Sequence, residues 1–228
     1  MFYYFGAKHA NASKYQPPHH DLIVEPFAGA AGYACYWLEK GAAQRAVLIE
    51  ADQRVVETWN RILAQTPEQI MAWTTPTEGE RTNDLCVIGS GGGGTLSNDT
   101  PNKVSSRQAA NFPAIRRRIA RMRATIGDRI EITHGDYRDA PDIEATWFID
   151  PPYQHQGHWY RHSSNAINYA SLSTWVRSRR GQVIACESAP ADWLPFRPLY
   201  SLNSLAGTDG TELVWESHPD PTLFGHSL

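Results

Sequence analysis

Apolar runs alternate with helical patterns near the start of the chain. Residues 22–24 and 46–49 are apolar runs typical of buried strands. Each is followed by a segment, 33–38 and 55–64, that we predict to be helical, and Gly41 stands where helices commonly end. This alternation predicts a βαβ unit with parallel strands.

The same alternation returns in the second half. Apolar residues spaced by four, three and four positions predict one buried face of a helix that ends at Gly127: Ile115, Ile119, Met122 and Ile126. Further predicted elements are strands at 130–133, 146–149 and 183–186, a helix at 172–180, and a terminal hairpin of 199–205 with 213–215. About seven strands with interleaved helices predict a Rossmann-like α/β fold, with an open, mostly parallel sheet and an antiparallel C-terminal hairpin. Ligands of such sheets bind beyond the carboxyl ends of the strands.

The pattern breaks down between Thr66 and Asn111. This segment contains Pro67, Pro76 and Pro101 and a glycine-rich run from Ile88 to Thr95. We therefore predict an inserted target-recognition region with a mobile loop at 66–111, and a catalytic domain made of 1–65 and 112–228.

Composition favours a compact soluble domain. The chain has 228 residues, of which 41% are hydrophobic, so it is not a disordered tail. No uncharged apolar stretch approaches the roughly 20 residues that cross a bilayer, and the N-terminus does not resemble a signal peptide. We expect a cytoplasmic protein with no membrane partner. Cys35, Cys86 and Cys186 are too few and too scattered for a disulfide framework, so reduced thiols are expected.

Positive charge is concentrated in one segment of an acidic chain. The net charge is −3, yet residues 103–129 hold eight basic side chains and one acidic one. This asymmetry indicates a polyanion bound on one face, with Arg116, Arg117 and Arg121 as candidate phosphate ligands. The alternative is an ordinary helix with a solvated basic face.

Acidic residues follow the first two predicted strands. Glu25 precedes Phe27 and the small residues around Gly29, which let a ligand approach the backbone. A carboxylate there repels a pyrophosphate but suits a cationic group such as the ammonium of a methionine moiety. Glu50 and Asp52 stand where a carboxylate takes ribose hydroxyls. Together they fit S-adenosyl-L-methionine (AdoMet) better than NAD, although a tight structural turn would also explain the glycines.

The sequence Asp150-Pro151-Pro152-Tyr153 follows an apolar strand. Prolines lack N–H groups, so this edge offers acceptors only, which match an amino group with two hydrogens to donate. Tyr153 adds a face on which a base can stack. Adenine's exocyclic nitrogen is a poor nucleophile, and two acceptors would aim its lone pair at a sulfonium methyl. The alternative is that the prolines merely stop a strand. Methylation at a cytosine ring carbon would use a thiolate nucleophile, but no cysteine stands in an obvious catalytic turn.

These segments, in this order, resemble Dam-type DNA adenine-N6 methyltransferases. The resemblance covers about half of the chain and rests on Tyr4–Lys8, Glu25–Gly32, Ile49–Asp52, His134–Tyr137 and Asp150–Tyr153. It implies the AdoMet-dependent methyltransferase fold. It places Tyr4 and Lys8 in the cofactor pocket, Glu25 at the methionine end, Asp52 or Glu50 at the ribose, and Asp136 at the cofactor adenine. Phe27, Gly29 and Tyr137 complete the expected cofactor site, and Asp150–Tyr153 would hold the target base.

The resemblance also implies DNA as partner, with the target adenine flipped out of the duplex. Aromatic and basic residues just after the proline edge suit phosphates and an orphaned base: His158, Trp159, Tyr160 and Arg161. The histidines of this loop could also suggest a metal, but methyl transfer from a sulfonium needs none. Because 66–111 departs from the family pattern, the target sequence does not transfer, and specificity could be relaxed.

We therefore expect a monomeric AdoMet-dependent DNA adenine methyltransferase. Restriction-modification, phage self-protection and replication marking all use this chemistry. Two alternatives stay open: the same chemistry on cytosine N4, RNA adenine or a glutamine amide, and a non-catalytic DNA-binding regulatory module.

Overall fold

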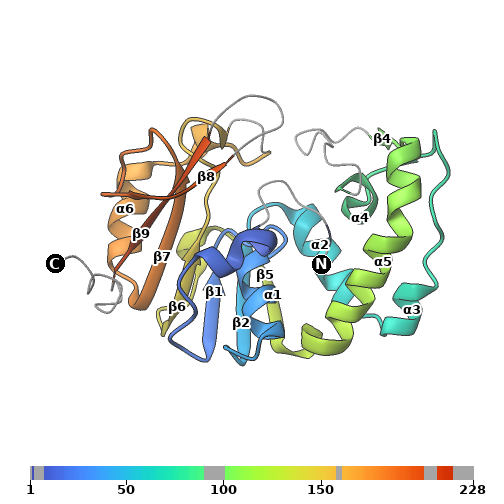
Figure 1. The fold of residues 1–228 in the computed structure, drawn as a ribbon, viewed down its shortest axis with the longest axis horizontal. Coiled ribbons are helices and arrows are strands. Elements are labelled where there is room, and N and C mark those ends of the chain that lie inside the picture. Colours follow the sequence, from blue (N-terminus) through green and yellow to red (C-terminus); the bar gives the residue numbers. More distant parts are fainter. Residues whose placement is uncertain (1, 3–7, 90–100, 158–160, 203–209, 218–228) are drawn as a thin grey trace.

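A seven-stranded sheet forms the centre of the molecule (Figure 1). The computed structural model describes residues 2, 8–89, 101–157, 161–202 and 210–217. The strand order is β5-β2-β1-β6-β7-β9-β8, with bounds Ile130–His134, Arg45–Glu50, Leu22–Glu25, Glu144–Ile149, Arg180–Ser188, Gly210–Glu216 and Arg197–Leu202. The first five strands are parallel, and β9 is antiparallel to both β7 and β8. This topology confirms the predicted Rossmann-like fold with an antiparallel C-terminal hairpin.

Helices cover both faces of this sheet. Neighbouring residues of β1 show the two layers: Ile23 packs into the core with α1 (Gly32–Glu39), α2 (Gln53–Leu63) and α5 (Ser106–Ile126), whereas Val24 packs into the core with α6 (Tyr169–Arg177). Burial on both faces explains the near-continuous apolar runs of the central strands. No helix in the described part of the chain is long and apolar enough to cross a bilayer.

Two predicted helices have different bounds in the structure. The helix expected at 172–180 is α6, which begins at Tyr169 because Asn168 caps it by accepting a hydrogen bond from the Ser171 N–H. Helix α5 begins at Ser106 and contains Pro113, since Ser105 and Gln108 form a capping box at its start.

The segment between Thr66 and Asn111 contains more regular structure than its sequence pattern predicted. It forms α3 (Pro67–Met71), β3 (Arg81–Thr82), α4 (Leu85–Ile88) and β4 (Asn102–Lys103), and α5 begins within it. These four elements have only two to five residues each, too few to display a period. Side-chain caps at Thr66 and Asp84 stabilise the two short helices. The described part of the chain also contains 3-10 helices at Gly127–Arg129, Tyr137–Asp139 and Ser164–Ala166.

The N-terminal segment runs along the sheet from the edge formed by the carboxyl ends of the strands to the edge formed by their amino ends. It begins with a 3-10 helix, η1 (Lys8–Lys14), beside the carboxyl ends of the strands. Tyr15 then packs edge-on against Phe148 of β6. At the opposite edge the His19 N–H donates to Thr146 and Gln182, near the starts of β6 and β7. This anchoring fixes where Lys8 lies.

Candidate active site

Carboxylate side chains gather at one edge of the sheet. The carboxyl ends of the parallel strands, and the start of antiparallel β9, bring together Glu25, Glu50, Asp136, Asp150, Glu187 and Glu212. Glu25, Glu187 and Glu212 are almost completely buried. Such an edge repels phosphates and attracts a cation.

The turn after β1 is held by Glu50. The Gly29 N–H donates to Oε2 of Glu50 at 2.8 Å, and the Asp52 N–H donates to Oε1 at 2.8 Å. Gly29 has φ 47° and Ala31 has φ 48°, a left-handed conformation that suits glycine and is rare for alanine. Trp59 donates to the Gly29 carbonyl at 2.9 Å. Glu50 therefore shapes the turn through its backbone contacts, whereas the sequence suggested only a ribose contact.

The Asp52 carboxylate forms an ion pair with Arg54. Nε and Nη2 of Arg54 lie 3.0 and 2.6 Å from the two Asp52 oxygens. Burial would raise the pKa of Asp52, but these hydrogen bonds and the charge of Arg54 lower it overall.

Glu25 lies at the end of β1 in a buried position. Its Oε1 accepts a hydrogen bond from the Ala34 N–H at 2.6 Å. Burial foremost, together with the charge of Asp150, raises the pKa of Glu25 to about 8. The side chain is therefore mostly neutral at pH 7 unless a cation comes to it.

Lys8 and Asp150 form a buried ion pair at the end of β6. Nζ of Lys8 lies 2.8 Å from Oδ1 and 2.9 Å from Oδ2 of Asp150. Burial alone would lower the pKa of Lys8, but the negative charges of Asp150 and Glu212 raise it overall. Burial, and secondarily Glu212, raises the pKa of Asp150, while Lys8 opposes that rise. The resemblance placed Lys8 with the cofactor; the structure places its ammonium on Asp150, and Tyr4 lies outside the described residues.

Tyr153 is fixed by the C-terminal hairpin. Its hydroxyl donates to Oε1 of Glu212 at 2.6 Å, and Tyr15 donates to the same oxygen at 2.6 Å. The ammonium of Lys8 lies 4.9 Å from the centre of the Tyr153 ring. Cys186 is buried beside this group, and burial raises the pKa of its thiol, which favours the neutral thiol over the thiolate.

Neighbouring side chains and backbone hold the segment Asp150–Tyr153, the proline edge, in place. The Tyr169 hydroxyl donates to the Pro152 carbonyl. A β-carbon on Gly157 would lie 2.7 Å from the carbonyl carbon of Pro152, so these backbones touch. The Gln154 N–H donates to Oε2 of Glu187 at 3.0 Å. The Tyr169 hydrogen bond therefore holds the Pro152 carbonyl in place.

Phe27 and Tyr137 lie together between the ends of β1 and β5. Their rings stack at 5.4 Å with an interplanar angle of 25°. Asp136 caps the turn after β5 and accepts from Nε of Arg138, and it stays partly exposed. Phe27 and Asp136 stay partly exposed, whereas Tyr137 is buried against Phe27.

The candidate nucleic-acid residues divide into three groups. Arg117 and Arg121 are exposed on α5, and Arg161 is exposed beyond the proline edge. Arg116 is only partly exposed and donates to the Trp73 carbonyl, so it holds α5 to the segment after α3. His158, Trp159 and Tyr160 lie outside the described residues.

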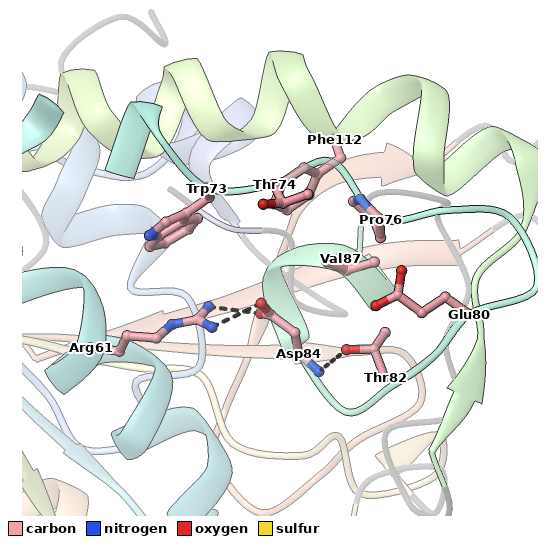
Figure 2. A pocket seen from close by; sticks show the side chains of 9 residues that line it. All are labelled: Arg61, Trp73, Thr74, Pro76, Glu80, Thr82, Asp84, Val87 and Phe112. Carbon is pink, nitrogen blue, oxygen red and sulfur yellow. Dashed lines mark hydrogen bonds and ion pairs between the residues drawn. The ribbon is translucent and has the colours of Figure 1, made fainter. Parts of the chain in front are cut away.

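A separate cavity of about 270 Å³ lies in the inserted region (Figure 2). Arg61 pairs with both oxygens of Asp84 at 2.8 Å on one side, and Trp73 covers Arg61 at 4.6 Å. Glu80 lines the opposite side. None of the residues that line this cavity belongs to the carboxylate edge.

Four residues of the site were not predicted from the sequence: Tyr15, Tyr169, Glu187 and Glu212. Glu187 had a usable signal, because it follows the apolar run 183–186 as Asp150 follows 146–149. The other three lie outside the motifs, and only the packing of their segments against the sheet brings them to the site.

Comparisons with known proteins add the following. No family model and no curated protein matches the sequence. Among solved structures, the rRNA methyltransferase AviRa from Streptomyces viridochromogenes is 12% identical with a TM-score of 0.41, over 86% of this chain and 76% of that one. A SAM-dependent methyltransferase from Neisseria gonorrhoeae is 14% identical with a TM-score of 0.40, over 97% and 69%. At identities and scores this low, what these proteins act on does not transfer to this chain.

Proposed function

We propose that this chain is an AdoMet-dependent methyltransferase that methylates the N6 amino group of adenine in DNA. One observation carries the proposal: the Asp150 carboxylate, which would form an acceptor pair with the Pro151 carbonyl, interacts electrostatically with the buried carboxyl of Glu25. The first pair suits an amino group, and the second site suits the ammonium of the cofactor.

The residues around the turn after β1 fit AdoMet. Glu25 is a buried acid whose ionised form becomes favourable when a cation lies beside it. Phe27 and Tyr137 offer a flat surface for an adenine ring, and Asp136 an acceptor for its amino group. Glu50 and Asp52 would take the ribose hydroxyls, because each carboxylate has lone pairs beyond those already used. Bound AdoMet supplies a methyl group on a positively charged sulfur.

The acceptor pair explains how a weakly nucleophilic amino group can react. Two hydrogen bonds to Asp150 and Pro151 would turn the nitrogen lone pair toward the methyl group. The charge of Lys8 favours the ionised form of Asp150, which accepts hydrogen bonds rather than donating them. As the new carbon–nitrogen bond forms, the nitrogen loses one proton, and an oxygen of Asp150 is placed to take it. Tyr153 would stack on the base.

Exposed basic residues support a nucleic acid as substrate. Arg117 and Arg121 on α5 can bind phosphates, and Arg161 follows the catalytic edge. Adenine N6 is inaccessible to such a pocket within a duplex, so the base would be flipped out.

The direct test is methyl transfer to defined acceptors. Purified protein is incubated with AdoMet and unmethylated duplex DNA, single-stranded DNA, RNA or a glutamine peptide, and the digested products are measured by mass. We expect N6-methyladenine from DNA. Methylation of RNA, cytosine or peptide alone would overturn the acceptor, and calorimetry without AdoMet binding would favour a non-catalytic DNA-binding module.

Asp150→Ala tests the role proposed for the Asp150 carboxylate. We expect it to abolish turnover, because the acceptor pair is lost, and to leave the Kd for AdoMet nearly unchanged. Substantial remaining turnover would refute the role of Asp150.

A further inference from the structure

The acceptor site on Asp150 is already engaged. Under the proposed function, on which this inference rests, Asp150 accepts a hydrogen from the substrate amino group. Yet Nζ of Lys8 lies 2.8 and 2.9 Å from its two oxygens. An ammonium centred on both oxygens uses a lone pair of each, and its positive charge weakens the hydrogen bond that either oxygen can accept from the incoming amino group.

Lys8 cannot simply retreat into solvent. The residue is only 8% exposed, and a buried ammonium without an anion is strongly destabilised. Any shift away from Asp150 therefore needs a second carboxylate within reach.

Glu212 is placed to receive it. Its Oε1 lies 3.8 Å from Nζ of Lys8. The hydroxyls of Tyr15 and Tyr153 donate to that same oxygen at 2.6 Å each, which fixes the position of the carboxylate. Glu25 is less suitable, because the Ala34 N–H occupies it and its pKa of about 8 leaves it mostly neutral at pH 7.

We propose that Glu212 is a positioning residue for methyl transfer: as the amino group of the substrate binds Asp150, the ammonium of Lys8 shifts toward Glu212 and leaves an Asp150 oxygen to the substrate. Tyr153 hydrogen-bonds to the same Glu212 oxygen. After the shift, Lys8 and the Tyr153 ring, on which the base would stack, therefore share Glu212 as a partner. Lys8 stays ion-paired throughout, and Asp150 is charged when the amino group binds.

Glu212→Gln tests the proposal, because glutamine keeps the size of the side chain and an acceptor oxygen but removes the charge. We expect the KM for adenine-containing DNA to rise about tenfold, with a smaller change in kcat. The Kd for AdoMet should stay within about twofold. Glu216→Gln is the matched control: it lies on the same strand and pairs with Arg197 instead. An unchanged KM in Glu212→Gln would overturn the inference.

The pH profile separates this role from a purely structural one. The titratable groups that face Asp150 are Lys8, Tyr15, Glu25, Tyr153, Cys186, Glu187 and Glu212. Glu212 raises the pKa of Asp150, so Glu212→Gln should move the acid limb of kcat/KM to lower pH. Glu216→Gln keeps all seven groups and should leave the limb in place. An acid limb that does not move in Glu212→Gln counts against the charge coupling.

A structure of the wild-type protein with an AdoMet analogue and an adenine oligonucleotide gives a readout that needs no variant to fold. Lys8 Nζ should lie about 3 Å from Glu212 Oε1. If Lys8 still bridges both Asp150 oxygens beside a bound adenine, this inference is wrong while the proposed function stands. If the wild-type protein methylates no nucleic acid, both are wrong.

Discussion

Gly32 at the start of α1 touches the backbone of Lys8. A β-carbon on Gly32 would lie 2.6 Å from the Lys8 nitrogen and 2.5 Å from the His9 nitrogen, closer than side-chain carbons approach backbone atoms. The absence of a side chain at position 32 therefore lets η1 come close enough for Lys8 to reach Asp150.

Gly32→Ala should displace η1 and pull Lys8 away from Asp150. We expect kcat to fall roughly a hundredfold, because small misplacements at a reacting centre cost about that much. Gly41→Ala is the control: its φ of 71° strains alanine, but nothing lies within 4 Å, so it should cost about 1 kcal/mol of stability without affecting kcat. Equal kcat in the two variants would contradict the packing argument. Methyl transfer and thermal unfolding measure the two effects.

Gly157→Ala should disturb the catalytic edge from behind. The new β-carbon would meet the carbonyl carbon of Pro152 at 2.7 Å and its Cβ at 2.8 Å, so the segment 150–153 has to move. We expect at least a tenfold loss of kcat with little change in AdoMet affinity. Gly79→Ala, with φ of 84° and open space around it, should lose stability only. Single-turnover kinetics would show whether the chemical step is the one affected.

AdoMet binding should release a proton from Glu25. The pKa of about 8 in the free protein leaves this carboxyl mostly protonated at pH 7, and the cofactor's ammonium would favour the ionised form. Calorimetry in two buffers of different ionisation enthalpy measures the release. Glu25→Gln should abolish it and weaken binding at least tenfold, because a charge-assisted contact is lost. Glu131→Gln, an exposed change on β5, should behave as wild type.

The same group makes stability depend on pH. Between the ordinary pKa of 4.5 and about 8, the folded state holds a proton on Glu25 that the unfolded state has lost. The free energy of unfolding should therefore fall as the pH rises through this window, and Glu25→Gln should show a shallower fall. Denaturant titrations at pH 6 and pH 8.5 measure the free energy of unfolding. An identical change with pH in the wild type and in Glu25→Gln would exclude the raised pKa.

The arginines of α5 should separate into binding and structural residues. Arg117→Ala and Arg121→Ala should each reduce the slope of log K for DNA against log salt by about 0.9, the value for one phosphate contact. Arg116→Ala should instead cost about 1–2 kcal/mol of stability, since the bond to the Trp73 carbonyl is lost. Fluorescence anisotropy over a salt series distinguishes them. An unchanged slope in both exposed variants would place the DNA elsewhere.

Local patterns predicted much of the fold. Strands such as β1 and β6 were visible because burial on both faces demands continuous apolar runs. The start of α5 was missed because its capping box, at Ser105 and Gln108, lies ahead of the apolar face used to find the helix. The elements of the inserted region were missed because each is shorter than a recognisable period.

The sequence by itself determined the sheet and the acidic residues at its strand ends, because both depend on short-range order: an apolar run, then a carboxylate or a glycine. Only the tertiary structure decided what those carboxylates contact. Lys8 reaches Asp150 across 142 positions, and Glu212 reaches Tyr153 across 59. Such pairs form where the N-terminal segment and the last hairpin pack against one sheet edge, and buried charges then select their partners from whatever that packing brings within hydrogen-bonding distance.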